Sequence, residues 1–282
     1  MPSEEPSRTA LMSAVSRGKH RLADPWPWVM DDPYALSLVG PTWPDIYATM
    51  TQVFRPPVLR QAMAAMINRA RYVEDRLEAG TFEQYVILGA GLDSFAWRRP
   101  DRLPTLRVFE LDHPATQAWK QERAAVLALP QHDQHIFVAT DFEIHSLQES
   151  LDVAGFDWTR PALFSWLGVT QYLTRDAITA TLQTVARAAA GSEITVTYIP
   201  PREFLDELGA EFIDTVARVA GDRGEPVHSL LAPDEALALV EDSGLIVRDH
   251  PARNDMHRRY FAGRTDGLSI PTTQRLITAG VR

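Results

Sequence analysis

The chain has 282 residues, of which 45% are hydrophobic and 23% charged, and its formal net charge at pH 7 is −9. This composition is ordinary for a globular protein with a sizeable core, and the acidic balance without a lysine- or arginine-rich block argues against a nucleic-acid or membrane partner. The absence of cysteine excludes disulfides and thiolate metal sites and favours a cytoplasmic protein, and no leader or membrane helix is expected.

The N-terminal segment is predicted to alternate between short helices and extended turns. We expect a first helix at Thr9–Val15, and we interpret the arginines near it, including Arg17, as a solvated basic face. The Asp24–Trp28 segment must be extended, because each proline moves its preceding residue away from helical angles. Asp31–Tyr34 has an aspartate cap and a proline in the first turn, which is typical of a helix start.

A long helix is predicted over Val58–Ala79, because apolar side chains recur there at helical spacing. Directly after it, the apolar run Gln84–Gly89 ends in Gly89-Ala90-Gly91 and predicts a buried strand that stops at a tight turn. A helix can then begin within Leu92–Arg99. Glycines leave bare backbone against which a ligand can lie, and this order of elements is typical of a nucleotide site. The motif alone is weak, since such turns also occur without any ligand.

A carboxylate further along the chain narrows the kind of ligand. A second strand is predicted at Leu106–Leu111, and Asp112 at its end follows Gly91 by 21 residues (112 − 91). A carboxylate in this position can accept both hydroxyls of a ribose. The third glycine of a dinucleotide motif is missing, because Ser94 stands in its place. Ribose without a diphosphate cradle indicates an adenosyl ligand such as S-adenosylmethionine and disfavours a nicotinamide-dependent dehydrogenase.

Strands and helices are predicted to alternate along the rest of the chain. Further strands are expected within His135–Phe142, Ala162–Leu173, Ser192–Ile199, Leu245–Val247 and His257–Phe261, the last two as a candidate hairpin at the sheet edge. Helices are expected at Pro114–Leu129, Ser146–Ala154, Ala177–Ala190, Phe204–Arg218 and Asp234–Ser243, with a loop at Gly221–Gly224. This alternation predicts an α/β fold with a mostly parallel sheet covered on both faces, and a ligand at the carboxyl ends of strands one, two and four.

Several of these residues carry a resemblance to a known family. Four segments resemble motifs of the leucine carboxyl methyltransferase family, and more narrowly of its bacterial branch of S-adenosylmethionine-dependent O-methyltransferases. They are Asp32–Ala35, Val86–Ser94, Phe109–Pro114 and Tyr260–Arg264. The resemblance implies a Rossmann-like class I methyltransferase fold, a mostly parallel seven-stranded sheet flanked by helices with an N-terminal helical cap. It also implies that residues 1–80 form the cap over the active site and that residues 81–282 form one continuous cofactor-binding core.

The resemblance implies roles toward S-adenosylmethionine. An arginine on the long helix, Arg69 or Arg71, is expected to bind the methionine carboxylate, because a guanidinium matches two carboxylate oxygens. Asp141 is expected to accept from the adenine amine and Phe142 to offer its amide or ring, and Asp141 can also cap the following helix. The other residues expected around the cofactor are Gly89, Ala90, Gly91, Asp112, His113, Trp166 and Leu167.

One position departs from the family pattern. Leu167 stands where the family has a glutamate that receives the ammonium group of the cofactor. Main-chain carbonyls near Gly89 or Trp166 are the expected replacements. The departure also motivates an alternative function, in which a non-catalytic binder of an adenosyl ligand or of a partner retains the methyltransferase fold.

The expected function is methyl transfer from S-adenosylmethionine to a carboxylate or hydroxyl of a small molecule, for instance in secondary metabolism. An in-line displacement depends mainly on positioning, and a carboxylate acceptor needs no base, whereas a hydroxyl does. No pattern supports a base, which favours a carboxylate. The candidate bases are His113, His228, His250 and His257, and the expected substrate contacts are Trp26, Gln171, Tyr172 and Tyr198. No metal-ligand spacing appears, so no metal is expected, and the oligomeric state stays open.

Overall fold

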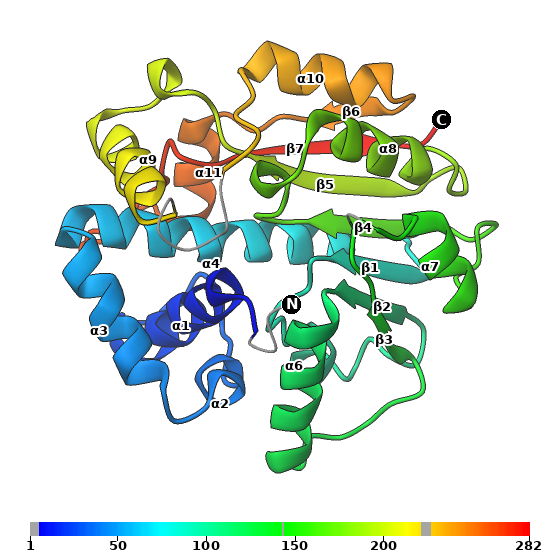
Figure 1. Ribbon diagram of the computed structural model, residues 1–282, viewed down its shortest axis with the longest axis horizontal. Coiled ribbons are helices and arrows are strands. Elements are labelled where there is room, and N and C mark those ends of the chain that lie inside the picture. The colour runs from blue at the N-terminus through cyan, green and yellow to red at the C-terminus, as the bar shows by residue number, and fades with distance from the viewer. Residues whose placement is uncertain (1–5, 143, 221–226) are drawn as a thin grey trace.

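A seven-stranded sheet organises the chain (Figure 1). The computed structural model describes residues 6–142, 144–220 and 227–282. The strand order is β3-β2-β1-β4-β5-β7-β6; β7 is antiparallel to both of its neighbours, and the remaining pairings of these strands are parallel. This confirms the predicted α/β fold with a mostly parallel sheet. The strands are β1 Gln84–Leu88, β2 Arg107–Asp112, β3 His135–Ala139, β4 Ala162–Trp166, β5 Glu193–Tyr198, β6 Ile246–Asp249 and β7 Arg275–Gly280.

The centre of the sheet brings the ends of three strands level with one another. Leu88, the last residue of β1, pairs with Leu111 of β2 on one side and with Trp166 of β4 on the other. The strand order changes direction at this point, because β2 and β3 continue on one side of β1 and β4 continues on the other. Ligands of open α/β sheets bind in the crevice at such a switch point. We refer to the carboxyl ends of β1, β2, β3 and β4 as the ligand edge.

Helices cover both faces of the sheet, which explains why β1 and β4 are buried along their whole length. One face is covered by α7 Leu147–Val153, α8 Arg175–Val185 and α10 Pro233–Asp242, which enclose one apolar cluster with the strands. The other face is covered by α4 Pro56–Ala79, α5 Phe95–Arg98, α6 Pro114–Val126 and α11 Arg253–Tyr260, which contribute to two further clusters.

The N-terminal helices form a cap around α4. They are α1 Arg8–Ala23, α2 Ala35–Val39 and α3 Trp43–Val53, of which α3 had no counterpart in the predicted elements. Together with α4 they enclose a shared apolar cluster. In Figure 1 these helices lie on the side of the molecule away from α7 and the amino ends of the central strands.

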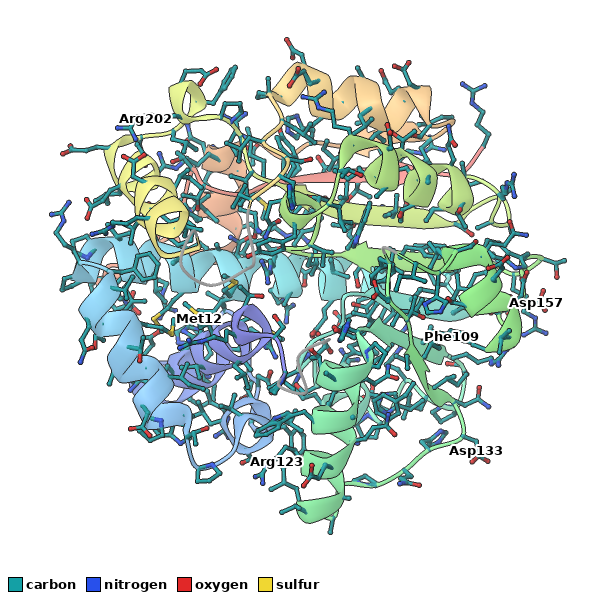
Figure 2. The ribbon with its side chains drawn as sticks, viewed as in Figure 1. Met12, Phe109, Arg123, Asp133, Asp157 and Arg202 are labelled. Atoms are coloured by element: carbon teal, nitrogen blue, oxygen red, sulfur yellow. The ribbon has the colours of Figure 1, made fainter. Side chains whose placement is uncertain are left out.

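A helix from outside residues 1–80 contributes to the same cap. α9 (Glu207–Ala220) packs into the cap cluster through Leu208, Phe212 and Val216, and the Phe212 ring stacks on Phe54 with 5.3 Å between centroids. Figure 2 shows Met12 of α1 and Arg202, next to α9, on the side of the molecule opposite to Asp157, which precedes β4. The division of the chain at residue 80 stays a prediction, and the cap cluster is built from both sides of it.

Hydrogen bonds to main-chain N–H groups explain where several helices begin. Ser7 Oγ accepts from the Ala10 N–H at 3.3 Å, and α1 then runs to Ala23, well beyond the predicted end. A helix follows the predicted start, but α2 begins at Ala35 with Tyr34 at the N-cap position, so Asp32 and Pro33 precede it. Asp32 Oδ1 still accepts from the Ala35 N–H at 3.0 Å. Thr174 caps α8, because its Oγ1 accepts from the Ala177 N–H at 3.3 Å.

Two strand predictions are wrong in detail. Residues His257–Phe261 lie in α11 and at its end rather than in a strand, because Met256 and Phe261 are buried from a segment that is otherwise polar all round. The final strand is β7, which pairs with β5 over six residues. The run predicted to continue to Leu173 stops at Trp166, where a turn with the short 3-10 helix η1 (Thr170–Tyr172) follows. The predicted loop at Gly221–Gly224 lies outside the described residues.

Candidate active site

The Gly89-Ala90-Gly91 turn closes β1 and is packed beneath the cap. Gly89 has a φ of +68° and Gly91 a φ of +53°, which is left-handed backbone that side chains disfavour. A Cβ on Gly89 would lie 2.4 Å from Val169 Cγ2, and a Cβ on Gly91 would lie 3.1 Å from Ala10 Cβ. Both glycines are therefore required by the turn and by the close approach of α1 and of the segment after β4, whether or not a ligand binds.

Asp112 ends β2, and its carboxylate faces the glycine turn. Its Oδ2 accepts from the Gly91 N–H at 2.5 Å and its Oδ1 from the His113 N–H at 2.7 Å. Burial raises the pKa of the Asp112 carboxyl above its ordinary value, although the two N–H donors oppose this. A carboxylate has about four acceptor positions, so both oxygens retain capacity for further donors such as ribose hydroxyls. The His113 side chain caps α6, where its Nδ1 accepts from the Ala115 N–H.

Asp141 and Phe142 follow β3 at the ligand edge. The Asp141 carbonyl accepts from the Ile144 N–H at 3.1 Å, which folds the chain into a turn. The cap of the next helix is Ser146, whose Oγ accepts from the Glu149 N–H, so Asp141 does not have the capping role considered for it. Phe142 is partly buried against the apolar cluster beneath α7 and α8.

Arg69 of α4 is a partly buried cation at the end of β4. Its guanidinium packs on Gly168, where a Cβ would lie 2.3 Å from Nη1. Its hydrogen bonds are long and reach neutral groups, Gln274 Oε1 at 3.4 Å and Ser13 Oγ at 3.3 Å. Burial and, secondly, the neighbouring Arg17 cation lower the pKa of Arg69 to about 10. Within residues 6–142, 144–220 and 227–282, no carboxylate forms an ion pair with Arg69.

Arg71, the other predicted carboxylate ligand, has a different environment. Its Nη2 lies 2.6 Å from Asp75 Oδ1 on the same helix, and its side chain is 40% exposed. Two residues correspond to about 200° around an α-helix, so Arg69 and Arg71 point in nearly opposite directions. Of the two, Arg69 is the arginine that reaches the ligand edge.

The end of β4 brings no charged side chain to this edge. Trp166 is fully buried, and Leu167 is partly buried against the two apolar clusters on the α4 face. The Gly168 N–H donates to Thr197 Oγ1 at 2.7 Å, which fixes the main chain next to Arg69. Leu167 therefore supplies no side-chain acceptor for an ammonium group.

Gln171 and Tyr172 lie in η1, directly after β4. Gln171 Nε2 donates to Gly168 O at 2.9 Å, and the Gln171 carbonyl accepts from the His228 N–H at 2.7 Å. Tyr172 is close enough to Arg69 to affect the pKa of that guanidinium, which it raises. The structure thus brings an amide and a phenol to the same short segment that contacts Arg69.

Trp26 and Tyr198, the other predicted substrate contacts, have different environments. Trp26 is 79% exposed and follows the end of α1 that is distant from Ala10; at 1.5 Å per residue, α1 is about 24 Å long. The Tyr198 hydroxyl is 2.9 Å from His250 Nε2, and its ring is buried in the cluster beneath α8 and α10. Burial raises the pKa of Tyr198 to about 12.

A buried ionic network fastens the cap to the segment after the glycine turn. Arg17 Nε donates to Asp32 Oδ2 at 2.8 Å, Arg17 Nη2 donates to Leu92 O at 2.6 Å, and Ser94 Oγ donates to Asp32 Oδ1 at 2.7 Å. Burial would raise the pKa of Asp32, but the Arg17 and Arg98 cations outweigh it and lower that pKa. Interpreting Arg17 as part of a solvated face is therefore wrong; it is 6% exposed, because α1 continues past its predicted end.

The sequence-based candidates omit several residues that contact the predicted site. Ala10 and Ser13 lie three residues apart on α1 and so face the same direction. Gln274 precedes β7 and reaches Arg69 from 205 positions away in the sequence. Small and neutral side chains of this kind form no local pattern, so only the folded arrangement identifies them. The residues concerned are Ala10, Ser13, Val169 and Gln274.

Buried polar atoms without a hydrogen-bond partner gather at the ligand edge. Three of the five such atoms in the described parts of the chain are Thr140 Oγ1, Trp166 Nε1 and Gln171 Oε1, at the ends of β3 and β4; the others belong to Gln61 and Arg123. Buried polar groups are normally paired, and each unpaired one costs about 1–3 kcal/mol. These three atoms belong to residues at or shortly after the carboxyl ends of parallel strands, which is where ligands of open α/β sheets bind.

The described residues contain neither a cluster of metal ligands nor a membrane-spanning helix. No three His, Asp or Glu side chains in this part of the chain lie close enough together to hold a metal ion. No helix within the same residues has the length and apolar character needed to cross a bilayer.

Comparison with known proteins finds a matching family model and several relatives. The model of the family described as leucine carboxyl methyltransferase matches residues 10–186, which include the glycine turn, Asp112 and β4. YktD of Bacillus subtilis is named as an inferred S-adenosyl-L-methionine-dependent methyltransferase. It is 32% identical to this chain in an alignment 305 residues long, which covers 99% of each protein. A Mycolicibacterium gilvum protein with the same inferred activity is 34% identical and covers 68% of this chain and 66% of its own.

Two solved structures share the fold along nearly the whole chain. A protein from Thermobifida fusca, described as an inferred methyltransferase, has a TM-score of 0.64 at 16% identity and covers 100% of this chain and 97% of its own. A DUF574 family protein from Streptomyces avermitilis has a TM-score of 0.62 at 16% identity, with 99% and 98% coverage. At this level of identity the comparison establishes the fold alone, and it agrees with the predicted Rossmann-like methyltransferase architecture.

Proposed function

The chain belongs to the leucine carboxyl methyltransferase family, in a bacterial group of S-adenosylmethionine-dependent methyltransferases, and we propose that it methylates an oxygen atom of a small molecule. The family assignment supports the cofactor and the class of reaction. The oxygen acceptor, a carboxylate or a hydroxyl, and the residues assigned below rest on the site itself.

The observation that carries the assignment is the partly buried Arg69 guanidinium, which has no carboxylate partner among the described residues. An uncompensated buried charge is strongly destabilising, so such a residue fits a site whose ligand brings the opposite charge. The carboxylate of the methionine moiety has that charge, and it can accept two parallel N–H bonds from a guanidinium. Arg71 already has Asp75 as its partner and needs no ligand.

The adenosine end of the cofactor would then lie across the glycine turn. Asp112 would accept the ribose hydroxyls through the lone pairs that the Gly91 and His113 N–H groups leave available. Asp141 and Phe142, at the end of β3, would contact the adenine. Asp112 and Arg69 approach this edge from different elements, so they would hold the two ends of the cofactor independently.

The chemistry requires positioning more than acid–base catalysis. Bound S-adenosylmethionine supplies an electrophilic methyl group whose leaving group is a neutral thioether. The chain must hold that sulfur in line with the acceptor oxygen and keep water away, and positioning of this kind is worth up to ~7–11 kcal/mol. We propose that the cap of residues 1–80, joined by α9, covers the site, since Ala10 of α1 already packs over Gly91.

The placement of the candidate bases supports a carboxylate acceptor. His113 caps α6, His250 bonds to Tyr198, and His257 stacks on Phe261 in the region of α11. The main chain of His228 contacts η1, and its side chain is exposed. A carboxylate is ionised at neutral pH and needs no base, whereas a hydroxyl acceptor would require one, and His228 would be the nearest candidate.

The test follows a labelled methyl group from the cofactor into acceptors of known chemistry. The protein is incubated with methyl-labelled S-adenosylmethionine and a panel of small carboxylic acids and phenols, and each product is treated with mild base. A methyl ester releases labelled methanol, whereas a methyl ether does not. We expect base-labile label and an unchanged rate for His228→Ala. Base-stable label together with loss of activity in His228→Ala would show that the acceptor is a hydroxyl and not a carboxylate. Cofactor binding without turnover of any acceptor would favour the non-catalytic binder.

A further inference from the structure

The amino group of the methionine moiety needs an acceptor, and the Leu167 side chain at the end of β4 does not supply one. An ammonium group has donors and no acceptor, and burying it without a partner is costly. Leu167 has an apolar side chain that packs into the clusters on the α4 face. If Arg69 binds the carboxylate, the acceptor must lie near Arg69, because the ammonium and the carboxylate are attached to the same carbon atom.

Gln171 carries a buried acceptor in that neighbourhood. The residue is 6% exposed, and its Oε1 has no hydrogen-bond partner within the described chain. The orientation of the amide follows from its contact with Gly168, because a carbonyl only accepts and the group 2.9 Å from it must be the NH2. The main chain of Gln171 is fixed separately, since its carbonyl accepts from the His228 and Ser229 N–H groups.

Gly168 links this acceptor to the carboxylate site. The Arg69 guanidinium packs directly on Gly168, and the Gln171 amide bonds to the carbonyl of the same residue. We propose that Gln171 Oε1 receives the ammonium group of S-adenosylmethionine while Arg69 binds its carboxylate. This inference rests on the proposed function and deepens it. It assigns the contact with the ammonium group, which the Leu167 side chain cannot make, to Gln171 as a positioning residue.

The measurement compares two ligands that differ in the amino group alone. One is S-adenosylhomocysteine, and the other is its deaminated analogue, in which hydrogen replaces the amino group. Affinities of both are measured by calorimetry for the wild type and for Gln171→Met, which keeps the length of the side chain and removes its polar atoms. A hydrogen bond to a charged group corresponds to about a tenfold to hundredfold change in affinity.

We expect Gln171→Met to weaken S-adenosylhomocysteine by about tenfold to hundredfold and to leave the deaminated analogue nearly unaffected. The ratio of the two affinities is the readout, because a partly unfolded preparation lowers the amount of active protein without changing that ratio. Gln171→Glu is the second variant, and it should shift the ratio in the opposite direction. A carboxylate at this position should bind the ammonium group of S-adenosylhomocysteine more tightly and should bind the deaminated analogue less well. Gln61→Met is the matched control: Gln61 is 8% exposed and also has an unpaired Oε1, but it lies two turns away from Arg69 on α4.

The outcomes separate this inference from the proposed function. An unchanged ratio in Gln171→Met, with tight binding of S-adenosylhomocysteine, would overturn the role of Gln171 and leave the cofactor site intact. An equal loss for both ligands would mean that Gln171 supports the fold of the site without contacting the amino group, which also overturns it. Failure of the wild type to bind S-adenosylhomocysteine would instead refute the proposed function.

Discussion

Replacing Arg69 by methionine is expected to stabilise the ligand-free protein and to abolish tight cofactor binding. The two effects have one cause, the partly buried guanidinium whose described hydrogen bonds reach only the neutral groups of Gln274 and Ser13. In the absence of ligand its charge opposes folding. In the presence of the cofactor carboxylate the same charge becomes the main polar contact. A residue with a purely structural role would not separate stability and binding in this way.

The magnitude follows from the pKa of Arg69, which burial lowers from its ordinary value to about 10. At about 1.4 kcal/mol per pH unit, keeping the guanidinium charged in the folded protein costs ~3 kcal/mol. A depressed pKa in the folded state means that stability rises only at a pH above about 10, where the folded protein has lost the proton and the unfolded chain still binds it. At pH 7 the whole cost is therefore present. Methionine also loses two long hydrogen bonds, so we expect a net gain of about 1–2 kcal/mol.

The assay is thermal unfolding with and without S-adenosylhomocysteine. The wild type should be stabilised by the ligand by about 2.7 kcal/mol at one hundred times the dissociation constant. Arg69→Met should unfold at a temperature several degrees higher without ligand and respond little to it. Arg71→Met is the matched control on the same helix, and it should change stability by less than about 0.5 kcal/mol and retain the ligand response. A lower unfolding temperature for Arg69→Met combined with an unchanged ligand response would refute the reasoning.

Three other substitutions test separate parts of the site. Asp112→Asn should reduce the affinity for S-adenosylhomocysteine in calorimetry by about ten- to a hundredfold, because it removes one acceptor oxygen; full affinity would exclude Asp112 from ribose binding. Gly91→Ala should lower the free energy of unfolding in urea by about 1–2 kcal/mol more than the control Gly263→Ala does. Both positions have a positive φ, but the new methyl group at Gly91 would lie 3.1 Å from Ala10 Cβ, whereas Gly263 has φ +76° and no atom within 4 Å. Equal losses in the two variants would contradict the packing of α1 on the turn. Asp32→Asn should cost about 3–5 kcal/mol in urea unfolding, because Arg17 and Arg98 lose a buried partner. The Arg17 and Arg98 cations lower the pKa of Asp32 in the folded state. The stability that Asp32 contributes should therefore be present above the ordinary pKa of an aspartate and disappear as the pH falls through the lowered pKa. Acid unfolding of Asp32→Asn that matches the wild type would count against the network.

The parts of the fold that were predictable are those recorded in local sequence. The β1 run followed by Gly89 and Gly91 determines a strand and a turn through residues that are adjacent in the chain. Asp112 was placed by its position at the end of a second such run, and the structure brings its carboxylate to the Gly91 N–H. Parallel strands that end at one edge bring such residues together without any information about side-chain packing.

Assignments that depend on distant partners were not predictable. β7 is a strand because it pairs with β5 and β6, whereas the local composition of Arg275–Gly280 has no strong strand pattern. His257–Phe261 contains aromatic residues that are also common in strands, yet it lies in a helix, because Met256 and Phe261 are buried there from an otherwise polar segment.

The choice between Arg69 and Arg71 shows the same limit at the level of one helix. Both lie within the predicted helix, and the apolar pattern does not identify which of its faces meets the sheet at that turn. In the structure, Arg69 shares a face with Tyr72, three residues later, whose hydroxyl lies 3.1 Å from Thr278 Oγ1 of β7. The register of α4 against β7 therefore selects Arg69, and β7 was the strand that the sequence did not reveal.

The contrast among buried arginines separates a structural role from a binding role. Arg17 and Arg98 are both buried between the cap and the sheet, and each has a carboxylate, Asp32 for the first and Glu74 for the second. Burial would lower the pKa of Arg98, but Glu74 outweighs it and raises that pKa. Arg69 is partly buried, and its pKa moves in the opposite direction. Burial therefore does not distinguish a structural arginine from a binding one. The distinguishing feature of Arg69 is that the described chain offers it no carboxylate, and a ligand that carries its own negative charge would supply one.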